Sequence, residues 1–361
     1  MEARDEITAA VDAVRLPDEA SRAAARARQL TLTKPAGALG RLEDLAVWCA
    51  GVRREPMTSL RRPVIVVAAA DHGVAAGGVS AYPTEVTVQM VHNFLAGGAA
   101  INVLAAQAGA EVRVVDAGVA SDIAHPRLHV AKVRRGTGDI TRSPAMSRED
   151  AEVLIARGVA FARRECAEGA NAIALGDMGI GNTTAAAAIT SARTGSAPAV
   201  TVGRGTGIDD AHFALKVDAV ARALGRDDAD PGGAGIALVA SIGGCEIAFL
   251  AGVAIGAAAS SVPVVLDGYP TTAAALVAVA ICPASVEYML AAHTSAEPGH
   301  RIALEHLGLR PLLDFGMRLG EGSGAALALM LLAAALRIPR EMATFEQAGV
   351  ATSAIETQPE Q

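Results

Sequence analysis

The sequence predicts an α/β protein with a mainly parallel sheet and helices on both faces of that sheet. Short runs of β-branched and small apolar residues alternate along the chain with longer amphipathic or alanine-rich segments. Several of these runs are apolar at every position, which is typical of strands buried on both faces. Hydrophobic residues make up 52% of the chain and charged residues 19%, so a sizeable core can form.

Aromatic residues are only 3% of the 361 residues, while alanine and glycine are abundant. The core must therefore be packed from small aliphatic side chains. This length fits one large domain or two, and we expect disorder only at the chain ends.

The charge pattern narrows the choice of partners. The net charge is −7 and no long run of Lys and Arg is present, so we do not expect nucleic acid as a partner. The four cysteines form no C-x-x-C pair, which fits buried thiols in a reducing compartment better than disulfides or zinc. The charged N-terminus lacks a secretory signal pattern, and we expect a cytoplasmic protein.

Two long apolar segments, 233–266 and 322–336, raise the alternative of a membrane protein. The first is interrupted by Gly243, Gly244 and Pro263. Neither segment has flanking aromatic belts or a basic cluster. Buried helices and strands of an α/β protein give the same hydropathy, so we expect no membrane span.

The elements follow in chain order. Residues 1–28 form a charged amphipathic pattern, 33–43 a loop that leads into a helix, and 56–62 a boundary. Apolar runs of strand length then occur at 63–70, 111–115, 172–175, 200–202, 263–267 and 277–282. Helical patterns lie between them, including 148–168, and an alanine-leucine helix begins after residue 322.

The segment 172–188 reads A-I-A-L-G-D-M-G-I-G-N-T-T-A-A-A-A, an apolar run followed by a glycine turn and an alanine helix. Its notable residues are Gly176, Gly179, Gly181, Asn182 and Thr183. The glycines remove Cβ atoms where a ligand can approach the backbone, and Asn and Thr are good N-cap types. A helix start with free N–H groups is an anion site. The alternative is a plain strand-to-helix turn.

Acidic residues stand at several predicted strand ends, namely Asp71, Asp116, Asp177 and Asp267. Together with glycine turns, such a rim suits a sugar phosphate, since backbone N–H groups can hold the phosphate and carboxylates the ribose hydroxyls. Lys216, behind a second glycine-rich turn, can add positive charge. The alternative for Lys216 is a solvated helix face.

Two further acidic positions have competing interpretations. The Asp71-His72 pair is a weak metal motif without an i, i+4 partner, and a polar loop is the simpler interpretation. Glu321 stands between glycines before an apolar helix. It can complement the helix dipole or, if partly buried, act as a general base because burial raises the pKa of a carboxyl group.

Six ordered blocks resemble one family, the nicotinate-nucleotide–dimethylbenzimidazole phosphoribosyltransferases. The first is K-P-A-G-A-L-G-R-L-E at 34–43, which is similar to K-P-x-G-S-L-G-x-L-E. The others are A-D-H-G-V with G-V-S-A-Y-P and Q-M at 70–90, then 176–184, 202–209, 293–300 and 318–324. The resemblance extends from about residue 31 to 349.

The resemblance implies a Rossmann-like large domain at 61–300 and a small helical domain built from 1–60 and 301–361. It also implies a homodimer without metal or cofactor. The implied reaction moves phosphoribose from nicotinate mononucleotide to 5,6-dimethylbenzimidazole or a related base. The products are α-ribazole 5′-phosphate and nicotinate, a step in assembling the lower ligand of cobamides.

Residue roles come from the same resemblance. Glu321 matches the catalytic base. Positions that match substrate contacts are Ser80, Tyr82 and Gln89 for the base pocket, and Gly176, Asp177, Gly179, Gly181, Asn182, Thr183, Lys216 and Ser295 for the nucleotide. Asp177 replaces the family's usual Glu and Ala38 its usual Ser. Because of Asp177, an alternative function stays open, that of a nucleotide-binding regulatory protein with reduced catalysis.

Overall fold

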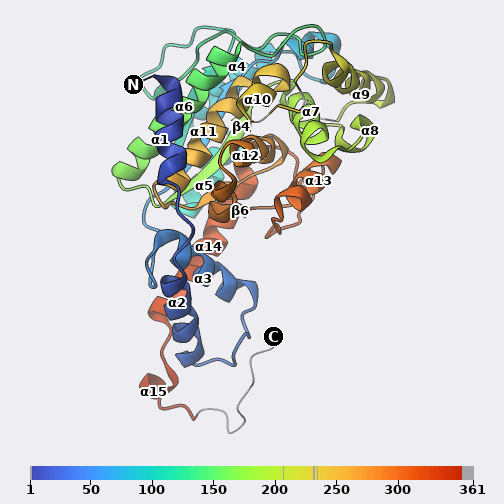
Figure 1. Cartoon of the computed structure of the whole chain (residues 1–361). Helices are drawn as coiled ribbons and strands as arrows, with labels where there is room; N and C mark the ends of the chain where they lie inside the picture. The colour runs from blue at the N-terminus through green and yellow to red at the C-terminus, as the bar shows by residue number, and fades with distance from the viewer. Residues whose placement is uncertain (1, 206, 231, 234, 352–361) are drawn as a thin grey trace.

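The computed structural model describes residues 2–205, 207–230, 232–233 and 235–351. Its centre is a six-stranded, fully parallel sheet with the strand order β3-β2-β1-β4-β5-β6 (Figure 1). The strands are β1 (Pro63–Ala70), β2 (Glu111–Gly118), β3 (Leu128–Val130), β4 (Ala172–Met178), β5 (Val264–Leu266) and β6 (Met289–Ala291). This order is that of the Rossmann fold. The predicted fold class is confirmed.

The central strand β1 shows why the sheet is buried on both faces. All eight residues of P-V-I-V-V-A-A-A are buried, and β1 pairs with β2 on one side and β4 on the other. Val64 and Val66 point into one hydrophobic core, whereas Ile65 and Val67 point into the other. A strand with no polar face needs helices on both sides, and the chain supplies them.

Helices cover both faces of the sheet (Figure 1). One face carries α1 (Ala3–Ala13), α6 (Arg148–Ala167), α7 (Asn182–Thr194), α10 (Ile236–Ile242), α11 (Cys245–Ala259) and α12 (Tyr269–Ile281). The other carries α4 (Glu85–Ala96), α5 (Ala100–Ala108) and α14 (Ser323–Glu341). Next to α7 or α12 lie α8 (Pro198–Thr201), α9 (Asp210–Gly225) and α13 (Pro298–Leu307).

Small side chains let the helices on the first face approach closely, as the low aromatic content predicts. The helices α6 and α11 make the most extensive helix contact of the structure's described part. A Cβ atom placed on Gly252 of α11 would lie 2.0 Å from the carbonyl oxygen of Ile155 in α6. The two backbones therefore touch at this point, and no larger residue fits there.

Two predicted strands are wrong. Residues 200–202 do not form a strand, because Pro198 begins the short helix α8, which ends at Thr201. The run at 277–282 forms the end of the buried helix α12 and its C-cap. The prediction of a strand is wrong here because an apolar run without a periodic pattern is compatible with both a buried strand and a buried helix. The short strands β3 and β6, with three residues each, escaped prediction.

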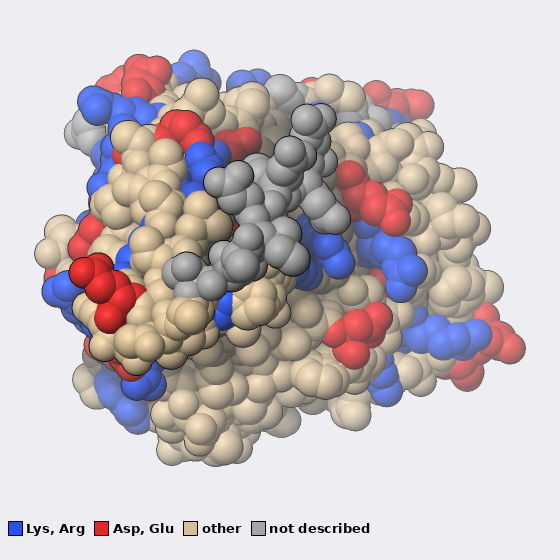
Figure 2. All heavy atoms as spheres, turned by 90° about the horizontal axis from the view of Figure 1, so that it is seen from below, with Lys and Arg blue, Asp and Glu red and all other residues tan. Residues whose placement is uncertain are grey.

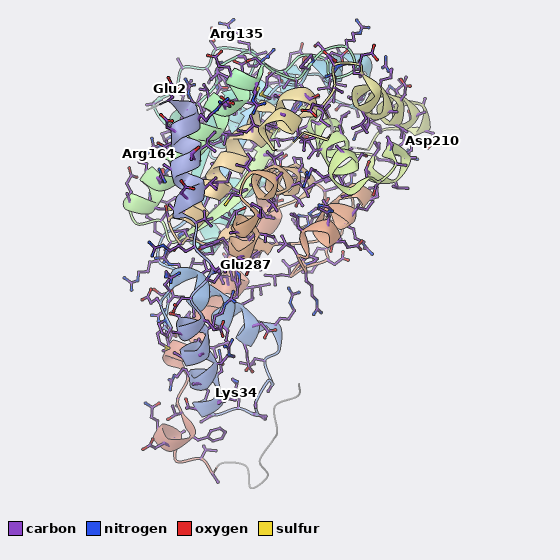
Figure 3. The ribbon with its side chains drawn as sticks, in the orientation of Figure 1. Glu2, Lys34, Arg135, Arg164, Asp210 and Glu287 are labelled. Atoms are coloured by element: carbon purple, nitrogen blue, oxygen red, sulfur yellow. The ribbon has the colours of Figure 1, made fainter. Side chains whose placement is uncertain are left out.

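Helices from both chain ends lie together below the sheet (Figure 1). They are α2 (Glu19–Thr31), α3 (Arg41–Arg53), the end of α14 and the short α15 (Phe345–Ala348). Lys34 lies in the loop between α2 and α3 (Figure 3). It forms an ion pair with Glu43 at 2.8 Å. Glu287, at the junction with the upper part, lies 3.7 Å from Arg22.

The boundaries of the predicted small domain stay a prediction. Helix α1, which the prediction assigned to that domain, packs against α6 and α11. Helix α13 likewise packs against α12, although it begins at residue 298. Residues 352–361 of the predicted domain lie outside the described residues.

The surface seen from below has acidic and basic side chains interspersed (Figure 2). Two helical segments, 85–108 and 323–341, are long and apolar enough to cross a membrane by length and composition. The first consists of α4 and α5, and α14 packs against the sheet. All four cysteines are free; three are buried, and Cys166 is half-buried.

Candidate active-site cleft

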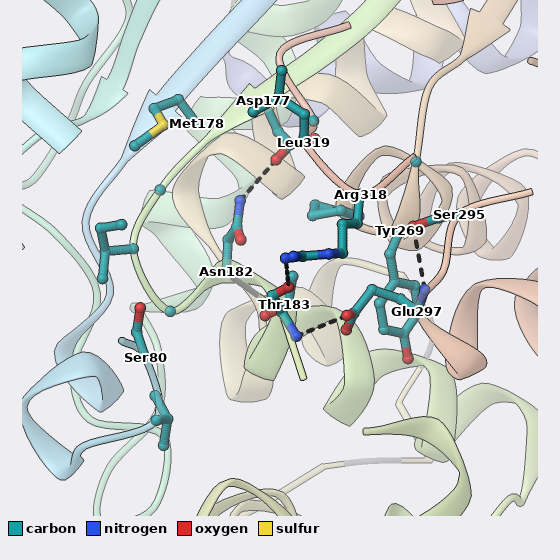
Figure 4. Close-up of a pocket in the computed structure, with 18 of the residues that line it drawn as sticks. Ser80, Asp177, Met178, Asn182, Thr183, Tyr269, Ser295, Glu297, Arg318 and Leu319 are labelled. Carbon is teal, nitrogen blue, oxygen red and sulfur yellow. Dashed lines mark hydrogen bonds between the residues drawn. The ribbon is translucent and has the colours of Figure 1, made fainter. Parts of the chain in front are cut away.

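A cleft opens at the carboxyl ends of β4, β5 and β6, the edge where open α/β sheets bind ligands (Figure 4). Its empty volume, which includes space open to solvent, is about 780 Å³. The lining residues come from segments far apart in sequence: 79–80, 177–183, Gly205, Lys216, 268–270, His293, Ser295, Glu297 and 318–320.

The glycine turn at the end of β4 forms one wall. Gly181 has a φ of +96° and is the N-cap of α7, which begins at Asn182. The Asn182 side chain does not cap its own helix; its Nδ2 donates to Oδ2 of Asp177 at 2.8 Å. The turn thus presents the N-terminus of α7 to the cleft, as an anion site requires.

Lys216 reaches the same wall from α9. Its side chain is only 1% exposed, and Nζ donates to Oγ1 of Thr183 at 2.8 Å and to the carbonyl of Gly203 at 3.0 Å. Burial lowers the pKa of Lys216 to about 8, and the negative charge of Glu297 opposes this shift. The alternative of a solvated helix face is wrong.

The neighbouring wall contains Ser295, Glu297 and Arg318 (Figure 4). The Glu297 carboxylate accepts a hydrogen bond from the backbone N–H of Gly205 at 2.7 Å. Arg318 Nη1 donates to the carbonyl of the same Gly205 at 3.0 Å. These two side chains hold the second glycine-rich turn from both sides.

Glu297 and Arg318 were not among the predicted site residues. The sequence carried a signal for both, because each lies in a polar block, 293–300 or 318–324, that supports the family resemblance. Their contacts with Gly205 could not be predicted from the sequence, because Gly205 comes from a distant segment and no local pattern shows which segments meet in the fold.

Asp177 lies in the cleft wall and is 6% exposed. Burial, followed by the carboxylates of Asp267 and Glu246, raises its pKa well above the ordinary value, and the hydrogen bond from Asn182 opposes this shift. One carboxylate oxygen, Oδ1, has no hydrogen-bond partner within the described part of the protein. Its shorter side chain therefore still reaches the cleft in place of the family's Glu.

Asp267, at the end of β5, fixes the loop that carries Glu321. Its carboxylate accepts three backbone N–H groups, from Gly322 at 3.1 Å, Gly324 at 2.7 Å and Ala325 at 3.0 Å. The start of α14 is thereby anchored to the sheet. Gly176 of β4 lies directly beneath this loop, since a Cβ atom there would be 2.5 Å from the carbonyl oxygen of Glu321.

Glu321 is 4% exposed and has a φ of +66°, which is uncommon for a residue other than glycine. Its Oε2 accepts from the backbone N–H of Ile101, in the first turn of α5, at 3.3 Å. Burial raises its pKa, and the bond from Ile101 opposes this shift. Glu321 thus complements the N-terminus of α5 rather than that of α14, while the adjoining Leu319 and Gly320 line the cleft.

Of the three residues predicted for the base pocket, the structure places only one in the described lining of the cleft. Ser80 lines the cleft (Figure 4). Tyr82 is 53% exposed and Gln89 is exposed on α4; neither belongs to the described lining of the cleft. Gly176 lies under the Glu321 loop rather than in the lining, whereas Gly179 belongs to it.

The Asp71-His72 pair forms no cluster of ligands. Asp71 accepts from the backbone N–H of Ala120 at 2.8 Å, whereas His72 Nε2 lies 2.9 Å from Oε1 of Glu246. Among the described residues, no group of three or more His, Cys, Asp or Glu side chains is placed to hold a metal ion.

Comparisons with known proteins find similarity over most of the chain. A family model described as phosphoribosyltransferase matches residues 14–350. The nicotinate-nucleotide–dimethylbenzimidazole phosphoribosyltransferase of Chloroflexus aggregans is 52% identical over 92% of this chain and 94% of its own. That of Mycobacterium avium is 53% identical over 92% and 96%. The crystal structure of the Thermus thermophilus enzyme, 49% identical, superimposes with a TM-score of 0.87 over 93% of this chain and 100% of its own.

We expect Asp267→Ala to lower the free energy of unfolding by at least about 3 kcal/mol, because it leaves three buried N–H groups without their acceptor. Ser147→Ala removes the exposed cap of α6 and serves as the control, with an expected loss of about 1 kcal/mol. Urea unfolding measures both. Equal losses would mean that Asp267 is no more than an ordinary helix cap.

Proposed function

We propose a function for this chain from one premise: it belongs to the phosphoribosyltransferase family whose model it matches over residues 14–350. It transfers phosphoribose from nicotinate mononucleotide to 5,6-dimethylbenzimidazole or a related base. The products are α-ribazole 5′-phosphate and nicotinate, used for the lower ligand of cobamides. The observation that carries this proposal is a cleft with a buried lysine at a glycine turn and a buried glutamate beside its wall.

The phosphate of the nucleotide fits the wall formed by the turn at 179–183. The N-terminus of α7 and the ammonium group of Lys216 meet there, and Thr183 lies between them. A lysine ammonium has three protons, and two are used on Thr183 and Gly203. The third is free to reach a phosphate oxygen, and a charge-assisted bond of this kind is stronger than a neutral one.

The acceptor base fits between Ser80, Met178 and Leu319, which lie on the other side of the cleft (Figure 4). Glu321 takes the N–H proton of the benzimidazole while the other ring nitrogen attacks C1′ of the ribose. The raised pKa of Glu321 suits a general base. The nicotinate departs with the bonding electrons and neutralises its own cationic ring, so positioning and one base suffice.

We also propose a cytoplasmic homodimer, as the resemblance implies. Large apolar side chains near the cleft are open to a subunit contact: Tyr82 is 53%, Phe315 68% and Leu319 57% exposed. The four free cysteines fit a reducing compartment. Sedimentation equilibrium measures the oligomeric state directly.

The activity is tested by incubating the protein with nicotinate mononucleotide and 5,6-dimethylbenzimidazole. We expect nicotinate and α-ribazole 5′-phosphate in equal amounts, identified by mass spectrometry and by the α configuration in the NMR spectrum. Competition with other benzimidazoles and with purines then ranks the bases. Nucleotide binding without any product would favour the regulatory alternative.

Lys216→Ala should raise KM for nicotinate mononucleotide about 10- to 100-fold and lower kcat less, because a charge-assisted contact of about 1.5–3 kcal/mol is lost. In the unaltered protein, kcat/KM for the nucleotide should fall as the pH rises above about 8, where Lys216 loses its proton. Arg222→Ala, at an exposed site on the same helix, is the control. An unchanged KM in the Lys216 variant would remove this residue from the phosphate site.

Glu321→Gln should leave both substrates bound and reduce kcat about 10²–10⁴-fold, because the amide keeps the shape of the side chain but accepts no proton. His293→Gln is the comparison, since His293 lines the same cleft and is the alternative base. Steady-state kinetics at saturating substrates give kcat. If the Glu321 variant keeps more than about a tenth of the turnover, far short of that range, the base lies elsewhere.

A further inference from the structure

A buried histidine outside the cleft lining connects two of the cleft's walls. His300, in the first turn of α13, is 0% exposed. Its Nδ1 lies 2.9 Å from the backbone nitrogen of Ser295, and its Nε2 lies 2.9 Å from Oγ1 of Thr272 in α12. Thr272 Oγ1 in turn lies 2.9 Å from the carbonyl oxygen of Gly268. Ser295 and Gly268 both line the cleft.

The partners fix the direction of every hydrogen bond in this chain. A backbone N–H can only donate, so Nδ1 of His300 accepts from Ser295 and carries no proton. The neutral ring therefore has its proton on Nε2 and donates it to Thr272 Oγ1. The hydroxyl in turn donates a hydrogen bond to the carbonyl oxygen of Gly268, which can only accept. The four groups form one continuous chain with a single polarity.

The surroundings keep the ring neutral, which this polarity requires. Burial lowers the pKa of His300 to about 3, with a further contribution from His293. The rings of His293 and Tyr269 lie 6.0 Å and 6.3 Å from that of His300. A second proton on the His300 ring would sit on Nδ1 and would break the hydrogen bond from the Ser295 N–H. That N–H has no other acceptor in this chain of bonds.

We propose that His300 is a positioning residue for the nucleotide: through Thr272 it sets the distance between the Ser295 wall and the Gly268 wall. This role rests on the proposed function. His300 is not among the residues that line the cleft, so its hydrogen bonds act on the cleft through Ser295 and Gly268, which are. The benzimidazole side of the cleft, at Ser80 and Met178, belongs to other loops and should not respond.

The chain contains a matched control, Thr271. Its hydroxyl is buried and donates to the same Gly268 carbonyl at 3.0 Å, but it makes no bond to His300. Thr271→Val and Thr272→Val thus remove the same kind of bond at adjacent positions with the same change of shape. Only Thr272→Val also leaves the Nε2–H of His300 without its acceptor.

We expect Thr272→Val to raise KM for nicotinate mononucleotide about tenfold, with kcat and the KM for 5,6-dimethylbenzimidazole changed less than about twofold. Thr271→Val should leave all three constants within about twofold. Thr272→Ser, which restores the hydroxyl, should restore KM. His300→Asn should match Thr272→Val, because its amide oxygen can accept from Ser295 but its side chain is too short to reach Thr272.

Equal effects of the two valine variants would overturn the proposal, because they would trace the loss to the start of α12 rather than to His300. Failure of Thr272→Ser to restore KM, or an equal rise in KM for the base, would overturn it as well. If Thr272→Val does not fold, His300→Asn provides the test: an unchanged KM for the nucleotide in that variant would overturn the proposal. No transfer by the unaltered protein would instead overturn the proposed function and this role with it.

Discussion

The candidate site depends on the carboxylate of Asp267, which holds the start of α14 against the end of β5. Three backbone N–H groups converge on it, and it is 1% exposed. The N-terminus of α14 compensates part of the cost of burying this charge. Gly176 leaves room for the loop 320–322 above β4, and the backbone N–H of Glu321 donates to the carbonyl of Asp177 at 3.2 Å. Together with the Asp267 anchor, these contacts set the position of Glu321.

The anchor also concentrates negative charge. Burial is the main cause that raises the pKa of Asp177, Asp267 and Glu321. The charge of Asp267 raises the pKa of the other two further, and that of Glu321 adds to the shift of Asp177. Glu321 additionally adopts a left-handed backbone, which costs energy in a residue with a side chain. The parallel sheet, with a hydrophobic core on each face, stabilises the fold enough to tolerate this strain. Strained backbone and buried ionisable groups are typical of active sites.

Much of this arrangement was predictable from the sequence. The features that were not predicted depend on contacts between segments that are distant in the chain. The long apolar run 63–70 and the glycine turn after 175 are local signals, and both elements formed where expected. Lys216 could not be told from a solvated lysine, because its burial depends on Thr183 and Gly203 from other segments. His300 looked like part of a polar loop, since its partners Thr272 and Ser295 meet only in the fold.

The distribution of charge across the cleft matches the donor of the proposed reaction. Lys216 and Arg318 lie at the glycine turns, where the phosphate is proposed to bind and where Glu297 offsets part of their charge, and Asp177 lies toward the sheet. Nicotinate mononucleotide has a negative phosphate at one end and, at the other, a pyridinium ring whose charge is balanced by the carboxylate on the same ring. The cations at the glycine turns therefore favour the orientation that places the phosphate beside them. Transfer removes the positive charge of the ring. In the proposed reaction the nicotinate then keeps only its negative carboxylate, which the carboxyl group of Asp177 does not attract, while contacts to the phosphate would be unchanged and would keep the product's ribose in place.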